Sequence, residues 1–279
     1  MEIFLNVLKE SLKVTLFVMA MMLAVDLINV KTKGKLEAVL KSSGRWKQYV
    51  IAALLGASPG CLGAFAGVSL YMHGMLSFGA LAGLMFATAG DEQFVMLALF
   101  PDTALVMFLI LFFLGIVVGF LSDYLIKKFN IKTCTDCEYR QYHPGQEGYK
   151  HYFREHIWLH ILKGHLVRIF LWTFGALLII EYGMKFIDLE RITAEYSFMF
   201  LLFSGVIGLI PESGPHLIFV TLFAKGLIPF SILFTSSIVQ DGHGMLPLLA
   251  FSVKDSVLIK TFNLIFGLVI GIILYLAGS

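Results

Sequence analysis

An internal repeat is the feature that most constrains the fold. When the chain is shifted by the 152 residues that separate Pro59 from Pro211, glycines recur in the same order along both halves. The matched glycines are Gly56 with Gly208, Gly74 with Gly226, Gly90 with Gly242, Gly115 with Gly267 and Gly119 with Gly271. Apolar residues coincide by chance in so apolar a chain, but ordered glycines and prolines do not. We therefore expect two structurally equivalent halves.

Long apolar stretches indicate the environment of the chain. Of its 279 residues, 58% are hydrophobic and only 14% are charged, whereas soluble domains carry about 25% charged residues. Crossing a bilayer core takes about 20 apolar residues. The candidate segments are 4–30, 49–72, 103–126, 166–184, 198–210 continuing through the broken segment that follows it, and 258–277. The composition predicts an all-α polytopic membrane protein surrounded by lipid. A net charge of +2 is too small to indicate a nucleic-acid partner.

Each half shows the same order of segments. A long helix and a polar loop precede a hairpin that is broken at Pro59 or Pro211 and again at Gly90 or Gly242. The last helix of each half carries two glycines four residues apart, which permit close helix packing. Residues 76–126 fit either two long helices or three short ones. We predict a first transmembrane repeat at 1–126, a cytoplasmic connection at 127–157 and a second transmembrane repeat at 158–279.

Loop charges predict how the halves are oriented. Residues 31–47 contain six Lys or Arg residues, whereas the matching loop at 185–196 has two, against three Asp or Glu. The positive-inside rule places the first loop in the cytoplasm and the second outside. We therefore expect two inverted-topology repeats of about five helices each in the inner membrane of the cell. Their broken or re-entrant hairpins would meet near the midplane, as in secondary transporters.

Ionisable residues gather at the predicted breaks. The second half places Glu212, His216, Asp241 and His243 there, and the first half places Asp91 and Glu92. A charged group at a helix centre costs about 2.5–3.5 kcal/mol in a membrane, so these side chains should face a cavity inside the protein. Glu212 and His216 are four residues apart, which puts them on one face of any helix that begins near Pro211.

Carboxylates combined with imidazoles are typical ligands of a divalent metal ion. They suit Mn²⁺ and, less selectively, Zn²⁺ or Fe²⁺. We expect that ion to be a transported substrate, with no tightly bound cofactor. Two structural alternatives stay open: Asp91 and Glu92 could cap a half-helix, and the other four residues could form ion pairs that hold half-helices together.

The connection between the halves contains a second group of metal-ligating residues. Cys134 and Cys137 form a Cys-x-x-Cys pair, with His143 nearby, which indicates a cytoplasmic metal-docking site. The spacing also fits a reduced, polar loop. The remaining cysteine, Cys61, falls in an apolar segment, so we expect no disulfide framework.

Four segments resemble a known bacterial membrane family. They are "SPGCLGAFAGVSLYMHGMLSFGAL" at 58–81, "ATAGDEQFVMLALFP" at 87–101, "GLIPESGPHLIFVTLFAKGLIPFSIL" at 208–233 and "VQDGHGMLPLLAFS" at 239–252. The family is that of ten-helix heavy-metal exporters, whose members are labelled manganese transporters or arsenic-efflux-like proteins. The resemblance implies a ten-helix membrane protein that exports a metal.

The sequence thus predicts a secondary transporter that exports Mn²⁺ by alternating access. No nucleotide-binding motif is present, so protons or the membrane potential would drive it. An alternative is an efflux permease for arsenicals or oxyanions, in which Cys61 would bind a thiophilic arsenical. An intramembrane metallohydrolase would use similar residues, but the chain contains no His-Glu-x-x-His. A homodimer is the protein partner that we consider.

Overall fold

The structure is a computed structural model. It describes residues 3–9, 11–13, 15, 16, 19, 20, 44–58, 60–90, 92–134, 167, 170, 171, 174, 175, 178, 197–212 and 214–278. All regular structure in these residues is helical, which confirms the all-α prediction.

The first half contributes five helices between residues 44 and 134. They are α3 (Arg45–Ala57), α4 (Leu62–Met72), α5 (Phe78–Ala87), α6 (Glu92–Leu99) and α7 (Pro101–Lys128). Residues 76–126 therefore form three helices rather than two. The hairpin between α4 and α5 is closed by Ser77, whose side chain caps α5 by accepting a hydrogen bond from the backbone N–H of Ala80.

The second half follows the same plan. Its helices are α11 (Ser197–Gly208), α12 (Gly214–Ala224), α13 (Phe230–Val239), the short 3₁₀ helix η4 (Gly242–Gly244), α14 (Met245–Phe251) and α15 (Val253–Leu276). Adding 152 to the bounds of α4 and α5 gives the bounds of α12 and α13. The 152-residue offset that relates the sequences thus relates the helices as well. The inverted orientation of the halves in a membrane remains a prediction.

Glycines end the helices at matching places. Gly90, after α5, has a φ of 60°, and Gly242, after α13, has a φ of 52°. A residue with a side chain has a higher conformational energy in this left-handed region, so glycine is the residue that allows the backbone to leave the helical path there. The helix before each glycine is short: α5 and α13 have 10 residues each. At a rise of 1.5 Å per residue, each is about 15 Å long, half the thickness of a bilayer core.

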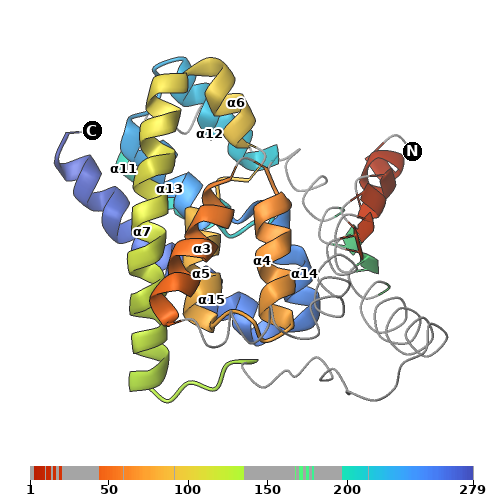
Figure 1. The fold of residues 1–279 in the computed structure, drawn as a ribbon. Coiled ribbons are helices and arrows are strands. Elements are labelled where there is room, and N and C mark those ends of the chain that lie inside the picture. The colour runs from red at the N-terminus through yellow and green to blue at the C-terminus, as the bar shows by residue number, and fades with distance from the viewer. Residues whose placement is uncertain are drawn as a thin grey trace, which may run out of the picture.

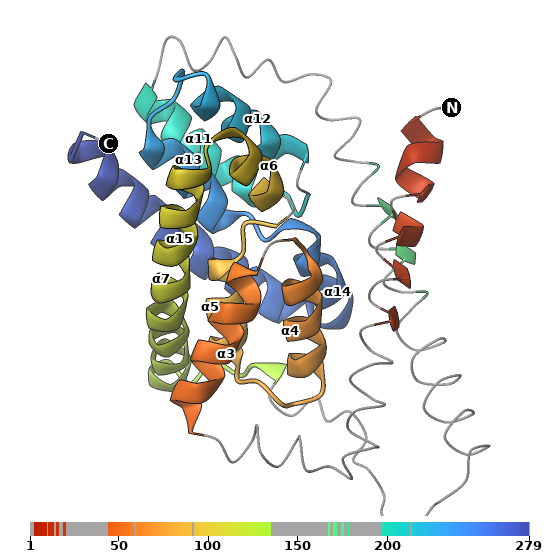
Figure 2. The same ribbon diagram turned by 45° about the horizontal axis from the view of Figure 1, so that its top comes forward.

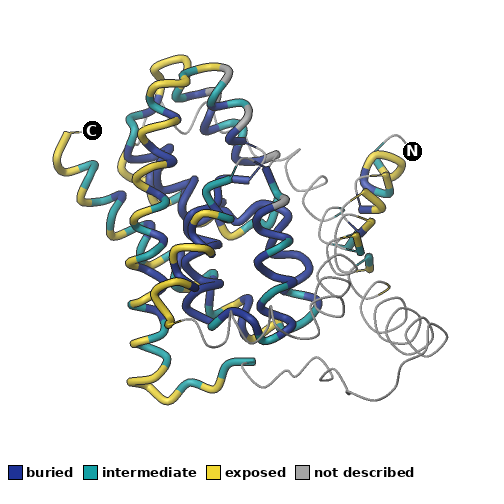
Figure 3. The backbone as a smooth tube through the Cα atoms, in the orientation of Figure 1, coloured by how far each residue is buried: buried dark blue, intermediate teal, exposed yellow. Residues whose placement is uncertain are grey.

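Two long helices, α7 and α15, flank the short ones. Figure 1 shows α7 running along the whole height of the described part. Of the described helices, these two are long and apolar enough to cross a membrane. Leu105, Leu109 and Phe113 of α7 are 58–59% exposed, so its outer face is apolar. In Figure 3, exposed residues lie along α7 and α15, whereas α5 is buried throughout.

Each half packs as a group of three helices. In the first, α5 contacts both α3 and α7, and in the second, α13 contacts both α11 and α15. Glycines let α5 and α7 approach closely: a Cβ atom built on Gly83 would lie 2.3 Å from the carbonyl oxygen of Gly115. The predicted role of the Gly115 and Gly119 pair in close packing is confirmed.

Short helices of one half also pack against helices of the other half. Helix α4 of the first half packs against α14 of the second, and α12 of the second packs against α6 of the first. Figure 2 shows both pairs, α12 with α6 at one end and α4 with α14 at the other. This arrangement brings the breaks of both halves into the interior.

Candidate functional site

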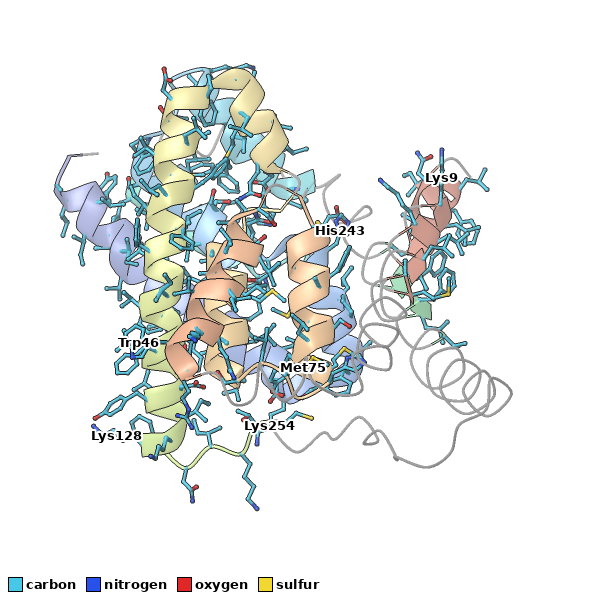
Figure 4. All side chains as sticks on the ribbon, viewed as in Figure 1. Lys9, Trp46, Met75, Lys128, His243 and Lys254 are labelled. Carbon is cyan, nitrogen blue, oxygen red and sulfur yellow. The ribbon has the colours of Figure 1, made fainter. Side chains whose placement is uncertain are left out.

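The site lies where three breaks in the helices approach one another. Cys61 ends the break between α3 and α4, and its Sγ atom is 4.0 Å from Nδ1 of His243 in η4. Gly244 lies against Ala64 of α4: a Cβ atom on this glycine would be 2.4 Å from the Ala64 Cβ atom. Figure 4 shows His243 beside one end of α4. The two halves of the chain therefore meet at His243.

Glu212 is the second partner of His243. The Nε2 atom of His243 is 3.1 Å from both carboxylate oxygens of Glu212, so an N–H there donates to the carboxylate. The His243 side chain is 6% exposed and that of Glu212 is 15% exposed. Oxygen, nitrogen and sulfur donors from two halves are thus collected in a largely buried place.

These donors are not arranged around one point. Cys61 faces one ring nitrogen of His243, and Glu212 faces the other. Among the described residues, no three His, Cys, Asp or Glu side chains are grouped so that they could hold a metal ion. A metal bound to one ring nitrogen of His243 would have to displace any proton on that nitrogen. To coordinate the same metal, either Glu212 or Cys61 would have to move to the side of the ring that the other occupies. The ligand set proposed from the sequence stays a prediction.

Asp241 forms a separate cluster with two residues of α15. Its Oδ2 atom is 2.7 Å from the Nζ atom of Lys260, and its Oδ1 atom accepts a hydrogen bond of 2.7 Å from the amide of Asn263. Asp241 is completely buried. Its charge is therefore already neutralised by Lys260, a partner that the sequence analysis did not consider.

His216 is buried and has partners on two other segments. Its Nδ1 atom is 3.1 Å from the hydroxyl of Ser236, and its Nε2 atom is 3.3 Å from the carbonyl oxygen of Ile210. The expectation that Glu212 and His216 share a helix face was wrong, because α12 begins only at Gly214. Pro215 then occupies the first turn, where its missing N–H leaves no intrahelical bond unmade.

The first half contributes neutral and acidic groups to the same interior. Glu92 and Gln93 begin α6, and both are buried. The Nε2 atom of Gln93 lies 3.5 Å from the carbonyl oxygen of Ala57, at the end of α3. The position of Glu92 in the first turn of α6 fits the capping alternative. Asp91 lies outside the described residues.

The proposed docking site in the connection falls mostly outside the described residues, which do not include Cys137 and His143. Cys134 is described and is disulfide-bonded, and a sulfur in that state supplies no thiolate to a metal. Its backbone N–H donates to Asp255 of α15 over 3.0 Å. Docking of a metal at Cys134 would therefore require reduction first.

Lys260 and Asn263 were missed by the sequence analysis. A signal was present, because a lysine in the middle of a long apolar helix needs a partner inside the protein. Ser256, Lys260, Asn263, Gly267 and Gly271 recur every three or four residues, which places them on one face of α15. That stripe marks the side of α15 that packs against α13.

One comparison with known proteins gives a match. The sequence model of a protein family described as "Putative, 10TM heavy-metal exporter" matches residues 1–174 and 166–277. Comparisons with curated proteins and with solved structures found no match.

Proposed function

We propose that this chain, which belongs to the family described as "Putative, 10TM heavy-metal exporter", carries a divalent metal ion out of the cell across the inner membrane. Membership in a multi-span family makes the molecule an all-α membrane protein. One observation supports the transport site above the others. Glu212 and His243 are paired over 3.1 Å inside the protein, with Cys61 of the other half beside them.

The position of this pair suits alternating access. Each of its residues lies in a break between short helices, where backbone groups are free of helical bonds and side chains face the interior. Because Cys61 of the first half lies beside this pair of the second half, a relative movement of the halves would change which side of the membrane reaches the ion. Protons or the membrane potential would drive the cycle.

The donors also bear on which ion is carried. Glu212 and His243 suit Mn²⁺, the substrate predicted from the sequence. A thiol next to His243 favours softer ions such as Zn²⁺. We propose Mn²⁺ as the first ion to test and Zn²⁺ and Fe²⁺ as the next, with Glu212 and His243 as the primary ligands.

Arsenical efflux is the second candidate, and Cys61 is the observation that favours it. This cysteine is not in a disulfide, and its thiol is partly buried next to His243. A thiophilic arsenical would bind its sulfur. Under this alternative, Cys61→Ser abolishes arsenite transport and leaves Mn²⁺ transport unchanged.

The test is ion flux into or out of liposomes that contain the purified protein. Mn²⁺, Zn²⁺, Fe²⁺ and arsenite are offered separately to the wild type and to Glu212→Gln, His243→Ala and Cys61→Ser. We expect the metal flux of the first two variants to be more than about tenfold lower than that of the wild type, because a primary ligand is removed. Asp102→Asn is the matched control, since Asp102 is exposed in the first turn of α7. Wild-type flux from Glu212→Gln and His243→Ala would rule out this site.

A further inference from the structure

The ammonium group of Lys260 is surrounded by three oxygen atoms, one at the end of α11 and two at the end of α13. Its Nζ atom donates to the carbonyl oxygen of Gly208 over 2.9 Å and to that of Val239 over 3.1 Å, and it lies 2.7 Å from the carboxylate of Asp241. The Lys260 side chain is 12% exposed and Asp241 is 0% exposed. This lysine is therefore held at a fixed point inside the protein.

The two carbonyl groups share a special position. Gly208 is the last residue of α11, and Val239 is the last residue of α13. Carbonyl groups at the end of a helix have no intrahelical donor, and the helix dipole adds about half a negative charge there. Two such ends and one carboxylate therefore point at a single place, which is the arrangement of a cation-binding site.

The equivalent positions of the first half hold uncharged residues. Shifting by 152 residues puts Phe108 at the position of Lys260 and Ala89 at that of Asp241. There, the end of α3 is approached by the neutral amide of Gln93. The lysine and the aspartate thus occur together in one half and are both missing from the other, as expected for two residues that act together.

We propose that Lys260 is a tethered cation, whose ammonium occupies a monovalent-cation site formed by the ends of α11 and α13 and by Asp241. When Lys260 is replaced by a residue with a short side chain, the site should bind an ammonium or alkali ion from solution. The oxygens stand at distances typical of N–H···O bonds, so NH₄⁺ should fit best. If the proposed transport function holds, export by the wild type needs no bound Na⁺ or K⁺ at this place.

The experiment compares thermal unfolding of the purified full chain in chloride salts of choline, Na⁺, K⁺ and NH₄⁺ at equal ionic strength. The wild type should have the same Tm in all four. Lys260→Ala leaves a buried carboxylate and two carbonyl ends without a cation, so its Tm in choline should fall by on the order of 10 °C. Adding NH₄⁺ should restore a large part of that loss in a saturable way, and Na⁺ or K⁺ a smaller part.

A double variant separates a cation site from a simple ion pair. Asp241→Asn with Lys260→Met removes both charges, so it can be purified even if Lys260→Ala does not fold. We expect its Tm to stay below that of the wild type and not to respond to cations, because the carbonyl ends remain uncapped and the carboxylate is gone. A wild-type Tm in the double variant would overturn the proposal, and so would a Lys260→Ala Tm that NH₄⁺ does not raise above its value in choline.

Transport measurements on the same samples keep this inference distinct from the proposed function. Metal flux by the wild type should be equal in choline and in Na⁺, and dependence on Na⁺ or K⁺ would contradict the tethered cation. If the wild type moves no metal at all, the proposed function fails, and the unfolding experiment still decides whether Lys260 fills a cation site.

Discussion

The contact between α5 and α7 gives a prediction whose size follows from the structure. Replacing Gly83 by alanine puts a Cβ atom 2.3 Å from the carbonyl oxygen of Gly115, whereas ordinary contacts begin at 3.4 Å. The obstructing atom belongs to the backbone, so the two helices must separate by about 1 Å. All residues of α5 are buried, and no neighbouring space can absorb that movement without repacking.

Overpacking of this kind costs about 1–3 kcal/mol. Alanine recovers about 1 kcal/mol of that because it favours a helix more than glycine does. The net loss for Gly83→Ala is then up to about 2 kcal/mol, which corresponds to a fall in Tm of up to roughly 8 °C. Since α5 leads directly into the break that precedes Glu92 and Gln93, we expect metal flux to decrease as well.

Gly205→Ala in α11 is the matched control for this variant. A Cβ atom at Gly205 would meet Cδ2 of Leu268 at 2.8 Å, which is the end of a side chain that can rotate. Its Tm should be unchanged or slightly raised, because the helix propensity gain remains. Thermal unfolding of both variants in the same detergent measures the difference. A Gly83→Ala protein at least as stable as Gly205→Ala would refute the close backbone contact.

Two further predictions concern a half-buried acid and a strained turn. Asp123 of α7 accepts hydrogen bonds from the Tyr49 hydroxyl over 2.8 Å and from the Gly79 N–H over 2.7 Å. Asp123→Asn should lower the free energy of unfolding by about 1–3 kcal/mol, because one of these donors loses its acceptor. Thermal unfolding beside the exposed control Asp102→Asn measures it, and equal Tm values would contradict the role of Asp123. Gly242→Ala places a side chain at a φ of 52° and should cost about 1–2 kcal/mol. It should also reduce metal flux by displacing His243, and a variant with wild-type Tm and flux would show that the turn is not strained.

Much of the helical plan was readable from the sequence, for a physical reason. Prolines and glycines act on the backbone next to them, so the breaks near Pro211, Gly90 and Gly242 follow from local chemistry. The long helices were predicted at 103–126 and 258–277 because their apolar runs are unbroken, and the structure places them at Pro101–Lys128 and Val253–Leu276.

The pairing of the charged residues was not readable in this way. Asp241 meets Lys260 only because α13 packs against α15, and Glu212 meets His243 across 31 residues of chain. Sequence spacing placed Glu212 and His216 on one helix face, but α12 begins only after Glu212. Partners that depend on how helices pack are fixed by three-dimensional contacts, to which a single sequence gives little access.

The crossed packing of α4 on α14 and of α6 on α12 limits how the protein can move. Short helices of each half contact the other half: α4 and α5 of the first, and α12 of the second. Neither half can therefore turn as an independent rigid body without moving helices of its neighbour, and any opening towards one side of the membrane must shear these interfaces together. Such coupling would make the two gates of a transporter move together, and it would disfavour a state that leaks through both.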